Sequence, residues 1–358
     1  MPVSSPGPAG AASALVIGAN GIVGSNMLAM LREQTDWQLH AVARAHPPSD
    51  DRVNRIAVDL LDEAASREAL GRIGPVDTIF FAALAPGPNP AAQVAPNLAL
   101  LRNGIAPFAA ADAGLRHVCL VQGTKWYGSH LGPYRTPARE DDPRHEGPNF
   151  YYDQRDWLSA AQQGKGWSFS TLRPHFISGF NLGNPHNMIA AVGAYAAIRR
   201  ELGEPLDFPG TQACFDTLSM ATDASLLNRA MLWAATTPAC ANQDFNLSNG
   251  DYFRWSGLWP AIAESFAMAP GPVRPLRLAK YMADKGPVWD AVLRRHALQP
   301  TRLEQIVDWN WADFLFRGDW DDLSSTIKAR RYGFADCLDT RDDMLATLAR
   351  YRRARILP

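Results

Sequence analysis

The sequence predicts an α/β fold built on a doubly wound parallel sheet and followed by a smaller mixed lobe. Short apolar runs alternate with segments of helical periodicity between residues 14 and 122. The first run ends in a glycine-rich turn at residues 18–24, and this turn opens a helix. After residue 173 the alternation becomes irregular, as it does where a lobe is threaded between the late elements of a sheet domain.

The apolar runs are short and unbroken, which is typical of parallel strands that are buried on both faces. The expected strands are 14–17, 38–43, 55–58, 77–83, 118–122, 168–172 and 245–247. The expected helices are 24–33, 61–70, 91–113, 150–162 and 189–198. This order predicts a flexible tail over 1–13, a nucleotide-binding Rossmann domain over 14–175, and a mainly substrate-covering lobe over 176–358, interleaved with late Rossmann elements.

The composition restricts the classes of function. The chain has 358 residues, of which 47% are hydrophobic and 20% charged, and its formal net charge is -1. Such a protein is folded and soluble, and it has no overall field to attract nucleic acid or an acidic membrane. There is no signal-like start and no apolar run of about 18 residues, so we expect a cytoplasmic protein without a membrane partner.

Cysteine and histidine spacing gives no sign of a metal site. The four cysteines lie far apart without a C-x-x-C pair, and the eight histidines show no ligand spacing. We therefore expect reduced thiols and no metal. In the lobe, Trp289, Trp309, Trp311 and Trp320 are expected in the core, with one or two of these tryptophans, near 309–316, walling an apolar pocket.

The turn Gly18-Ala-Asn-Gly21-Ile-Val-Gly24 predicts a dinucleotide site. Gly18 permits a tight turn, Gly21 lets the backbone approach the pyrophosphate, and Gly24 lets the helix pack closely on the strand. The helix then presents unpaired N–H groups and the positive end of its dipole to the phosphates. The strand before the turn and the helix after it favour this interpretation over a plain βα turn.

The end of the second strand indicates NADP(H) as the cofactor. A carboxylate there would bond the ribose 2′-hydroxyl of NAD, but Arg44 stands at this place and offers a fork of donors to a 2′-phosphate. The other expected cofactor contacts are Asn20, Ile22, Val23, Asp59, Leu60, Ala82, Ala83, Gln122, Gly123, Tyr151, Pro174 and Phe176. Asp59 and Leu60 are expected at the adenine, and Pro174 and Phe176 at the nicotinamide.

The chemical end of the site departs from the usual pattern. The glycine spacing is that of extended short-chain dehydrogenases, which carry Tyr-x-x-x-Lys on the helix after the fifth strand. Here Tyr151 is followed four residues later by Arg155, so the motif fails. A lysine does occur directly after the fifth strand, at Lys125, where ligands bind in this architecture.

Several longer motifs resemble one family. They are Gly123-Thr-Lys125-Trp-Tyr127-Gly128, Asn149-Phe-Tyr-Tyr-Asp153, Arg173-Pro174, Phe245-Asn-Leu-Ser-Asn-Gly-Asp251, Lys285-Gly-Pro-Val-Trp289 and Tyr332-Gly-Phe334. From about Ala14 to Pro358 the chain resembles the progesterone 5β-reductase / iridoid synthase-like family, an atypical branch of the extended short-chain dehydrogenases. The resemblance implies NADPH-dependent reduction of an activated C=C bond, with Lys125 and Tyr151 as the catalytic pair.

The resemblance also implies a small apolar α,β-unsaturated carbonyl substrate, steroid- or monoterpenoid-like. Leu84 stands where plant members have an aromatic residue, and the loop 87–90 also differs, so the plant substrates do not carry over. Tyr127 either lines the pocket or packs beneath it.

Two other functions stay open. One is a carbonyl reductase or epimerase of the same superfamily, which Arg155 disfavours, and the other is a non-catalytic NADP-sensing protein. A homodimer formed through segments 91–113 and 150–162 stays open by analogy.

Overall fold

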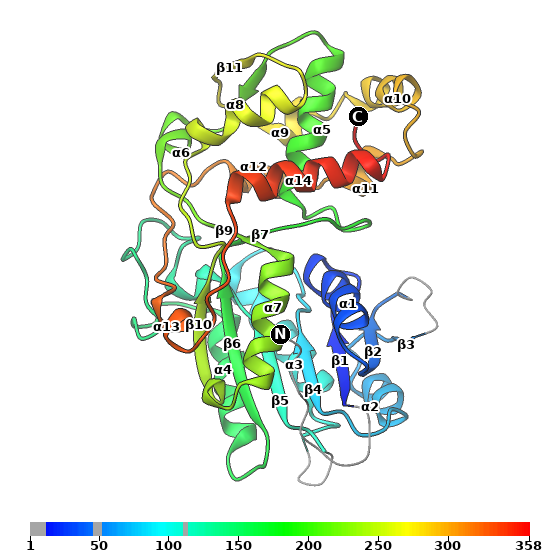
Figure 1. Ribbon diagram of the computed structural model, residues 1–358, viewed down its shortest axis with the longest axis vertical. Coiled ribbons are helices and arrows are strands. Elements are labelled where there is room, and N and C mark those ends of the chain that lie inside the picture. Colours follow the sequence, from blue (N-terminus) through cyan, green and yellow to red (C-terminus); the bar gives the residue numbers. More distant parts are fainter. Residues whose placement is uncertain (1–11, 46–51, 110–113) are drawn as a thin grey trace.

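The computed structural model describes residues 12–45, 52–109 and 114–358. A parallel sheet of seven strands forms the core of its lower part, as Figure 1 is drawn. The strands of this sheet are β1 (Ser13–Ile17), β2 (Gln38–Ala43), β3 (Val53–Ala57), β4 (Thr78–Phe81), β5 (His117–Val121), β6 (Ser168–Pro174) and β10 (Gln243–Leu247). Their order is β10-β6-β5-β4-β1-β2-β3, and every pairing is parallel. The predicted doubly wound α/β fold is confirmed.

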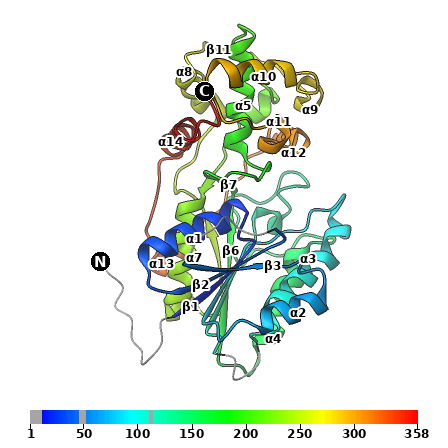
Figure 2. The same ribbon diagram turned by 90° about the vertical axis from the view of Figure 1, so that its right-hand side faces the viewer.

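Helices cover both faces of this sheet (Figure 2). On one face lie α1 (Ile22–Gln34) and α7 (Ala224–Thr236); on the other lie α2 (Glu63–Gly71), α3 (Pro90–Ile105) and α4 (Phe150–Gln162). Successive residues of a strand point to opposite faces, so β1 feeds both cores. Ala14 and Val16 pack toward α1 and α7, whereas Leu15 and Ile17 pack toward α2 and α3.

The upper lobe is largely helical and has a core of its own (Figure 1). Its elements are α5 (Met188–Glu201), β8 (Leu206–Phe208), α6 (Gln212–Asp216), α8 (Trp255–Ser265), β11 (Pro270–Val273), α9 (Leu278–Tyr281), α10 (Gly286–Arg295), α11 (Leu303–Ile306), α12 (Trp309–Leu315) and α14 (Thr340–Arg353). Trp289 is buried in this core, and Trp309 and Trp311 pack partly buried against it. The prediction that Trp320 lies in the core is wrong, because Trp320 is half-buried outside this cluster.

The chain passes between the lobe and the sheet more than once. The short parallel pair β7 (Phe176–Ser178) and β9 (Ala221–Asp223) leads from the sheet and back to it, and α7, the 3-10 helix η2 (Pro238–Cys240) and β10 then complete the sheet domain. Helix α13 (Ile327–Arg331) also lies against β10. A boundary at residue 175 therefore marks only the first exit from the sheet.

Some element ends differ from those expected. Strand β4 ends at Phe81, so Ala82 and Ala83 follow it in a loop, and α3 ends at Ile105 well before residue 113. The edge strand β10 is longer than predicted because it pairs along β6 over its whole length. The expected tail lies mostly outside the described residues, and Ser13 already belongs to β1.

None of the described helices combines the length and the apolar character that crossing a membrane requires.

Candidate active site

The glycine turn after β1 forms a close-packed cradle. Gly18 has a φ of +87°, and a Cβ there would lie 2.8 Å from the backbone of Ala82 and Ala83. A Cβ on Gly24 would lie 2.3 Å from the carbonyl oxygen of Gly18. Both positions thus need glycine, one for its conformation and both for space. Helix α1 starts here with no side-chain cap and no acidic residue in its first turn, which leaves its positive end to a ligand.

Two asparagines beside this cradle have unsatisfied polar atoms. Asn20 donates to the carbonyl oxygen of Ala45 at 3.2 Å, and Asn181 donates to Ser25 Oγ at 2.8 Å. The Oδ1 atoms of both asparagines are buried without a hydrogen-bond partner among the described residues. Buried polar atoms of this kind are usually paired, so they fit a site that a polar ligand completes.

The loop that holds Asn181 also reaches the lobe. The hydroxyl of Tyr351, on α14, accepts from the backbone N–H of Asn181 at 3.1 Å and from Asn187 Nδ2 at 2.9 Å. Asn181 Nδ2 additionally donates to the carbonyl oxygen of Asn20 at 3.3 Å. Asn181 therefore connects the glycine turn to the C-terminal helix α14.

The residues expected at the adenosine end lie at neighbouring strand ends. Arg44 follows β2 and Asp59 follows β3, and these strands pair in parallel. Arg44 is exposed and makes no hydrogen bond or ion pair within the described part of the chain. Asp59 accepts from the backbone N–H of Leu61 at 3.0 Å, and Leu60 is buried. A guanidinium in this position has its donors available for an anionic group.

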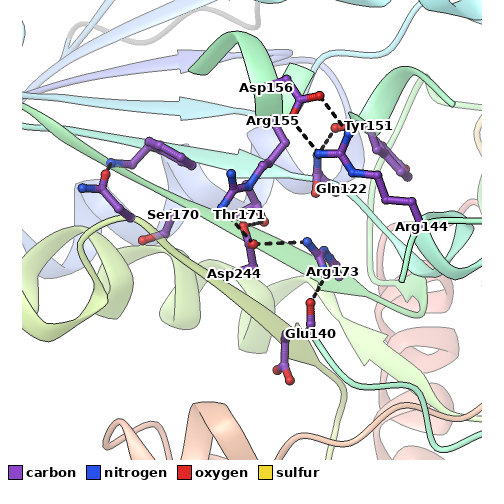
Figure 3. A network of polar contacts seen from close by, with 12 residues as sticks. Gln122, Glu140, Arg144, Tyr151, Arg155, Asp156, Ser170, Thr171, Arg173 and Asp244 are labelled. Carbon is purple, nitrogen blue, oxygen red and sulfur yellow. Dashed lines mark hydrogen bonds and ion pairs between the residues drawn. The ribbon is translucent and has the colours of Figure 1, made fainter. Parts of the chain in front are cut away.

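The segment after β5 brings the predicted catalytic residues to the same edge of the sheet. Gln122 Nε2 donates to the backbone carbonyl of Tyr151 at 2.8 Å (Figure 3). A Cβ on Gly123 would lie 3.2 Å from the Tyr151 hydroxyl and 3.5 Å from the carbonyl oxygen of Pro174. The phenol therefore lies close over glycine backbone, beside the carboxyl end of β6.

Lys125 is in the 3-10 helix η1 (Thr124–Tyr127) and lines a cavity of about 300 Å³. The other lining residues are Gly87, Pro88, Asn89, Pro90, Gln93, His130, Pro148, Asn149, Phe150 and Phe314. Lys125 Nζ lies 5.9 Å from the ring centroid of Phe314, which comes from α12 of the lobe. The cavity thus lies between the sheet edge and the lobe, where ligands bind in open α/β sheets.

Tyr151 does not line this cavity itself, although its neighbours Asn149 and Phe150 do. Its ring lies 4.3 Å from that of Phe150, centroid to centroid. Within the described residues, no hydrogen bond joins the Tyr151 hydroxyl to Lys125 Nζ. The two residues belong to different elements, Tyr151 to α4 and Lys125 to η1.

Burial shifts the pKa values of Tyr151 and Lys125 in opposite directions. It raises the pKa of the Tyr151 hydroxyl above its ordinary value and lowers the pKa of the Lys125 ammonium. The phenol is therefore a neutral O–H donor at neutral pH. The lysine gives up its proton more readily than a surface lysine does.

Arg155, which stands where the conventional motif has its lysine, is paired with a carboxylate of the sheet. Its guanidinium pairs with Asp244 on β10 at 3.4 Å, and the same carboxylate pairs with Arg173 at 3.4 Å (Figure 3). Thr171 Oγ1 also donates to Asp244, at 2.7 Å. Arg155 thus belongs to a structural network across β6 and β10.

Of the two residues expected at the substrate, neither lines the cavity. The hydroxyl of Tyr127 donates to Asn246 Oδ1 at 2.6 Å and accepts from Arg173 Nη1 at 3.1 Å, so the structure favours its packing role. Burial accordingly raises the pKa of Tyr127 to about 12. Leu84 is 57% exposed, in the loop after β4. Phe176 is partly buried in β7 and meets Phe253 edge to face.

Comparison with known proteins agrees with this geometry. Residues 14–358 match the PRISE-like Rossmann-fold domain. The chain belongs to the PRISE-like Rossmann-fold family. This PRISE-like protein is an enzyme, an oxidoreductase of the extended short-chain dehydrogenase/reductase superfamily. The family predicted from the motifs is thereby confirmed.

Curated relatives of this PRISE-like protein align over nearly its whole length. It is 34% identical to (S)-8-oxocitronellyl enol synthase CYC2 of Camptotheca acuminata, over 96% of this chain and 93% of the relative. It is 31% identical to 3-oxo-Delta(4,5)-steroid 5-beta-reductase of Arabidopsis thaliana, with the same coverage of 96% and 93%. Its fold is similar to that of Thermus thermophilus UDP-glucose 4-epimerase, solved in complex with NAD, with a TM-score of 0.66 and 16% identity over 96% of this chain and 99% of that one.

Sequence reasoning missed several residues of the PRISE-like site. His130 was overlooked because a single histidine in a loop has no spacing signal, and Asn181 because its partners are far away in the sequence. Asn149 had a readable signal, since an asparagine directly before a helical segment is a typical N-cap. Phe314 lines the cavity, whereas Trp309 and Trp311, the tryptophans expected at a pocket wall, do not.

Proposed function

We propose that this protein is an NADPH-dependent ene-reductase that adds hydride to the β-carbon of an α,β-unsaturated carbonyl compound. The observation that carries the proposal is the exchange of roles between two cations. Lys125 lines the cavity at the sheet edge, whereas Arg155, at the conventional lysine position, is engaged by Asp244. A conventional carbonyl reductase or epimerase needs its cation at the position of Arg155.

The proposed substrate is a small and mainly apolar molecule. The cavity walls include the rings of Phe150 and Phe314 and the prolines at 88, 90 and 148. Two relatives are named for related chemistry, one as an enol synthase and one as a steroid 5-beta-reductase. Both names refer to reactions that pass through or reduce a conjugated carbonyl system, and they support the same reaction class here.

In the proposed mechanism, Tyr151 and Lys125 bind the carbonyl oxygen of the substrate. NADPH, when bound, supplies the hydride. As the β-carbon is reduced, negative charge develops on the carbonyl oxygen, and a neutral phenol and an ammonium group stabilise this enolate as an oxyanion hole does. Removal of one such donor typically lowers the rate about 100- to 1000-fold. The α-carbon is protonated by solvent, so no further acid is needed.

The chain's residues fit NADP(H) as the cofactor. The cradle of Gly18, Gly21 and Gly24 with the uncapped α1 is suited to a pyrophosphate, and Arg44 is suited to a 2′-phosphate. The unpaired Oδ1 atoms of Asn20 and Asn181 supply further polar contacts. Gly123 and Pro174 are proposed to face the nicotinamide, because a Cβ on Gly123 would lie close to both the Tyr151 hydroxyl and the carbonyl oxygen of Pro174.

The decisive experiment follows NADPH oxidation with 2-cyclohexen-1-one, with the saturated cyclohexanone, and without substrate. We expect turnover of the enone alone. Turnover of the saturated ketone alone would identify a carbonyl reductase, and tight NADPH binding without any turnover would identify a sensor.

The variants Tyr151→Phe and Lys125→Met test the assignment of roles. Each removes one donor from the carbonyl oxygen, so each is expected to lower kcat about 100-fold or more. Wild-type enone rates in both variants would show that the chemistry lies elsewhere.

A further inference from the structure

The polar side chains that line the cavity differ in whether their polar atoms already form hydrogen bonds within the protein. Asn89 Oδ1 accepts from the backbone N–H of Ala92 at 2.9 Å, and Gln93 Nε2 donates to the carbonyl oxygen of Gly87 at 3.3 Å. Asn149 is likewise engaged by backbone groups. Lys125 Nζ, Asn89 Nδ2 and Gln93 Oε1 also have no hydrogen bond within the described residues, but among the described lining residues it is His130 that has an enclosed side-chain polar atom without a partner. Lys125 is already assigned to the carbonyl oxygen.

His130 is half-buried, five residues after Lys125, in the turn that follows η1. Its Nδ1 is enclosed and has no hydrogen-bond partner within the described residues. Its ring meets that of His145 edge to face, with 5.6 Å between the centroids. Burial first, and then the proximity of Lys125 and His145, lowers the pKa of His130 from 6.5 to about 4. The imidazole is therefore neutral at pH 7, with one donor and one acceptor.

A neutral imidazole among largely apolar lining residues favours ligands that carry a hydrogen-bonding group. A fully apolar ligand that covers the ring would also take water from Nε2, the ring nitrogen that is not already enclosed, and would leave it without a partner, which is unfavourable. A hydroxyl both donates and accepts, so it pairs with the imidazole in either tautomer. Sites built around an unpaired polar group discriminate against ligands that lack the matching group.

We propose that His130 is a specificity-determining residue that binds a hydroxyl group of the substrate, remote from the carbonyl oxygen held by Lys125 and Tyr151. The substrate class is thus a hydroxylated α,β-unsaturated carbonyl compound. This inference rests on the proposed ene-reductase function and narrows its substrate. His130 acts in it through binding alone, with no part in proton or hydride transfer.

The test compares (E)-2-octenal with its 4-, 6- and 8-hydroxy derivatives, which place the hydroxyl at increasing distance from the carbonyl. In the wild-type protein we expect at least one hydroxy-octenal to exceed octenal in kcat/KM by about 3- to 10-fold, the size of one neutral hydrogen bond. In His130→Phe that ratio is expected to fall to about one. His130→Gln, which keeps a donor and an acceptor, is expected to restore part of the preference.

The ratio within each variant is the readout, so a general change in activity does not imitate the effect. His296→Phe, a histidine that does not line the cavity, serves as the matched control and is expected to keep the wild-type ratio. A ratio near one in the wild type for all three derivatives, or an unchanged ratio in His130→Phe, would overturn the role of His130.

A second readout separates this inference from the proposed reaction. Dissociation constants of octenal and the hydroxy-octenals are measured by calorimetry on the NADP⁺-loaded protein, where no reduction occurs. If no compound is reduced in the presence of NADPH, the proposed reaction is wrong. Binding that favours a hydroxy-octenal in the wild type and loses this preference in His130→Phe still supports the hydroxyl site, and binding without any preference rejects it.

Discussion

The side-chain amide of Asn149 donates a hydrogen bond to the carbonyl oxygen of Lys125 over 2.8 Å. The other end of the same side chain, Oδ1, caps α4 by accepting from the backbone N–H of Tyr151 at 3.1 Å. The two proposed catalytic residues belong to different elements, η1 and α4, and this one side chain fixes the backbone of both. Their separation therefore depends on an asparagine that contacts the backbone of each.

Asn149→Ala is expected to lower both stability and kcat. Loss of the cap costs about 1 kcal/mol, and loss of the link to Lys125 is expected to lower kcat about 10-fold with a smaller change in KM. Asn149→Asp keeps an acceptor for Tyr151 but no donor for Lys125, so it should retain stability and still lose kcat. Asp62→Ala, which removes the cap of α2, is the matched control and should lose stability only. Normal kcat in Asn149→Asp would refute the positioning role.

Gly24→Ala is expected to weaken cofactor binding. The added Cβ would lie 2.3 Å from the carbonyl oxygen of Gly18, which is backbone and has no room to move. The turn must open, and we expect the dissociation constant of NADPH to rise at least 10-fold. Gly257, inside α8, has no heavy atom within 4 Å of such a Cβ. Gly257→Ala should bind NADPH normally, and equal binding by both variants would show that the turn does not hold the cofactor.

Arg44→Ala is expected to discriminate between the two nicotinamide cofactors. The guanidinium is proposed to pair with the 2′-phosphate, which NADH lacks. The dissociation constant should rise about 10-fold or more for NADPH and change little for NADH, as measured by quenching of tryptophan fluorescence. An equal loss for both cofactors would remove the assignment to NADP(H).

His117 makes the stability of the fold depend on pH. It is 3% exposed in β5 and its Nδ1 lies 2.9 Å from Ser168 Oγ, and burial lowers its pKa from 6.5 to about 4. Between these values the unfolded chain binds a proton that the folded chain does not, so the stability that is complete above pH 6.5 falls as the pH drops toward 4. The loss at pH 4.5 is about 2–3 kcal/mol.

His117→Asn should remove this part of the pH dependence. Urea unfolding at pH 8 and pH 4.5 measures it, because the comparison within one variant cancels any general loss from the substitution. If the difference between the two pH values is the same in the wild type and the variant, His117 does not contribute to the acid sensitivity.

The parts of the site that follow from local backbone geometry were predictable from the sequence. Gly18 and Gly24 are required by a turn whose constraints lie within seven residues, and Arg44 is placed by the end of a strand that is easily recognised. The exchange of a lysine at 155 for Lys125 was also readable from the sequence, and the catalytic role of Lys125 stays a prediction. These inferences depend on neighbours in sequence or on the common edge of a parallel sheet.

Other features depend on contacts that no local pattern records. Arg155 pairs with Asp244, 89 residues away, so its structural role was not readable from its own segment. Whether Tyr127 faces the cavity or the interior is decided by Asn246 and Arg173, which accept from and donate to its hydroxyl. His130 enters the cavity through the path of a loop. Element ends were least certain where tertiary pairing extends a strand, as in β10.

The contacts of Asn181 have a consequence for the fluctuations of two segments that lie far apart in the sequence. This residue holds the glycine turn through Ser25 and Asn20, and it holds the C-terminal helix through the hydroxyl of Tyr351. A ligand that binds the glycine turn only when the turn is ordered also stabilises the contacts that keep it ordered, including those of Asn181. Occupation of the turn should therefore slow amide hydrogen exchange in α14, far along the chain from the glycines. The fluctuations of α14 and those of the glycine turn are therefore expected to be coupled.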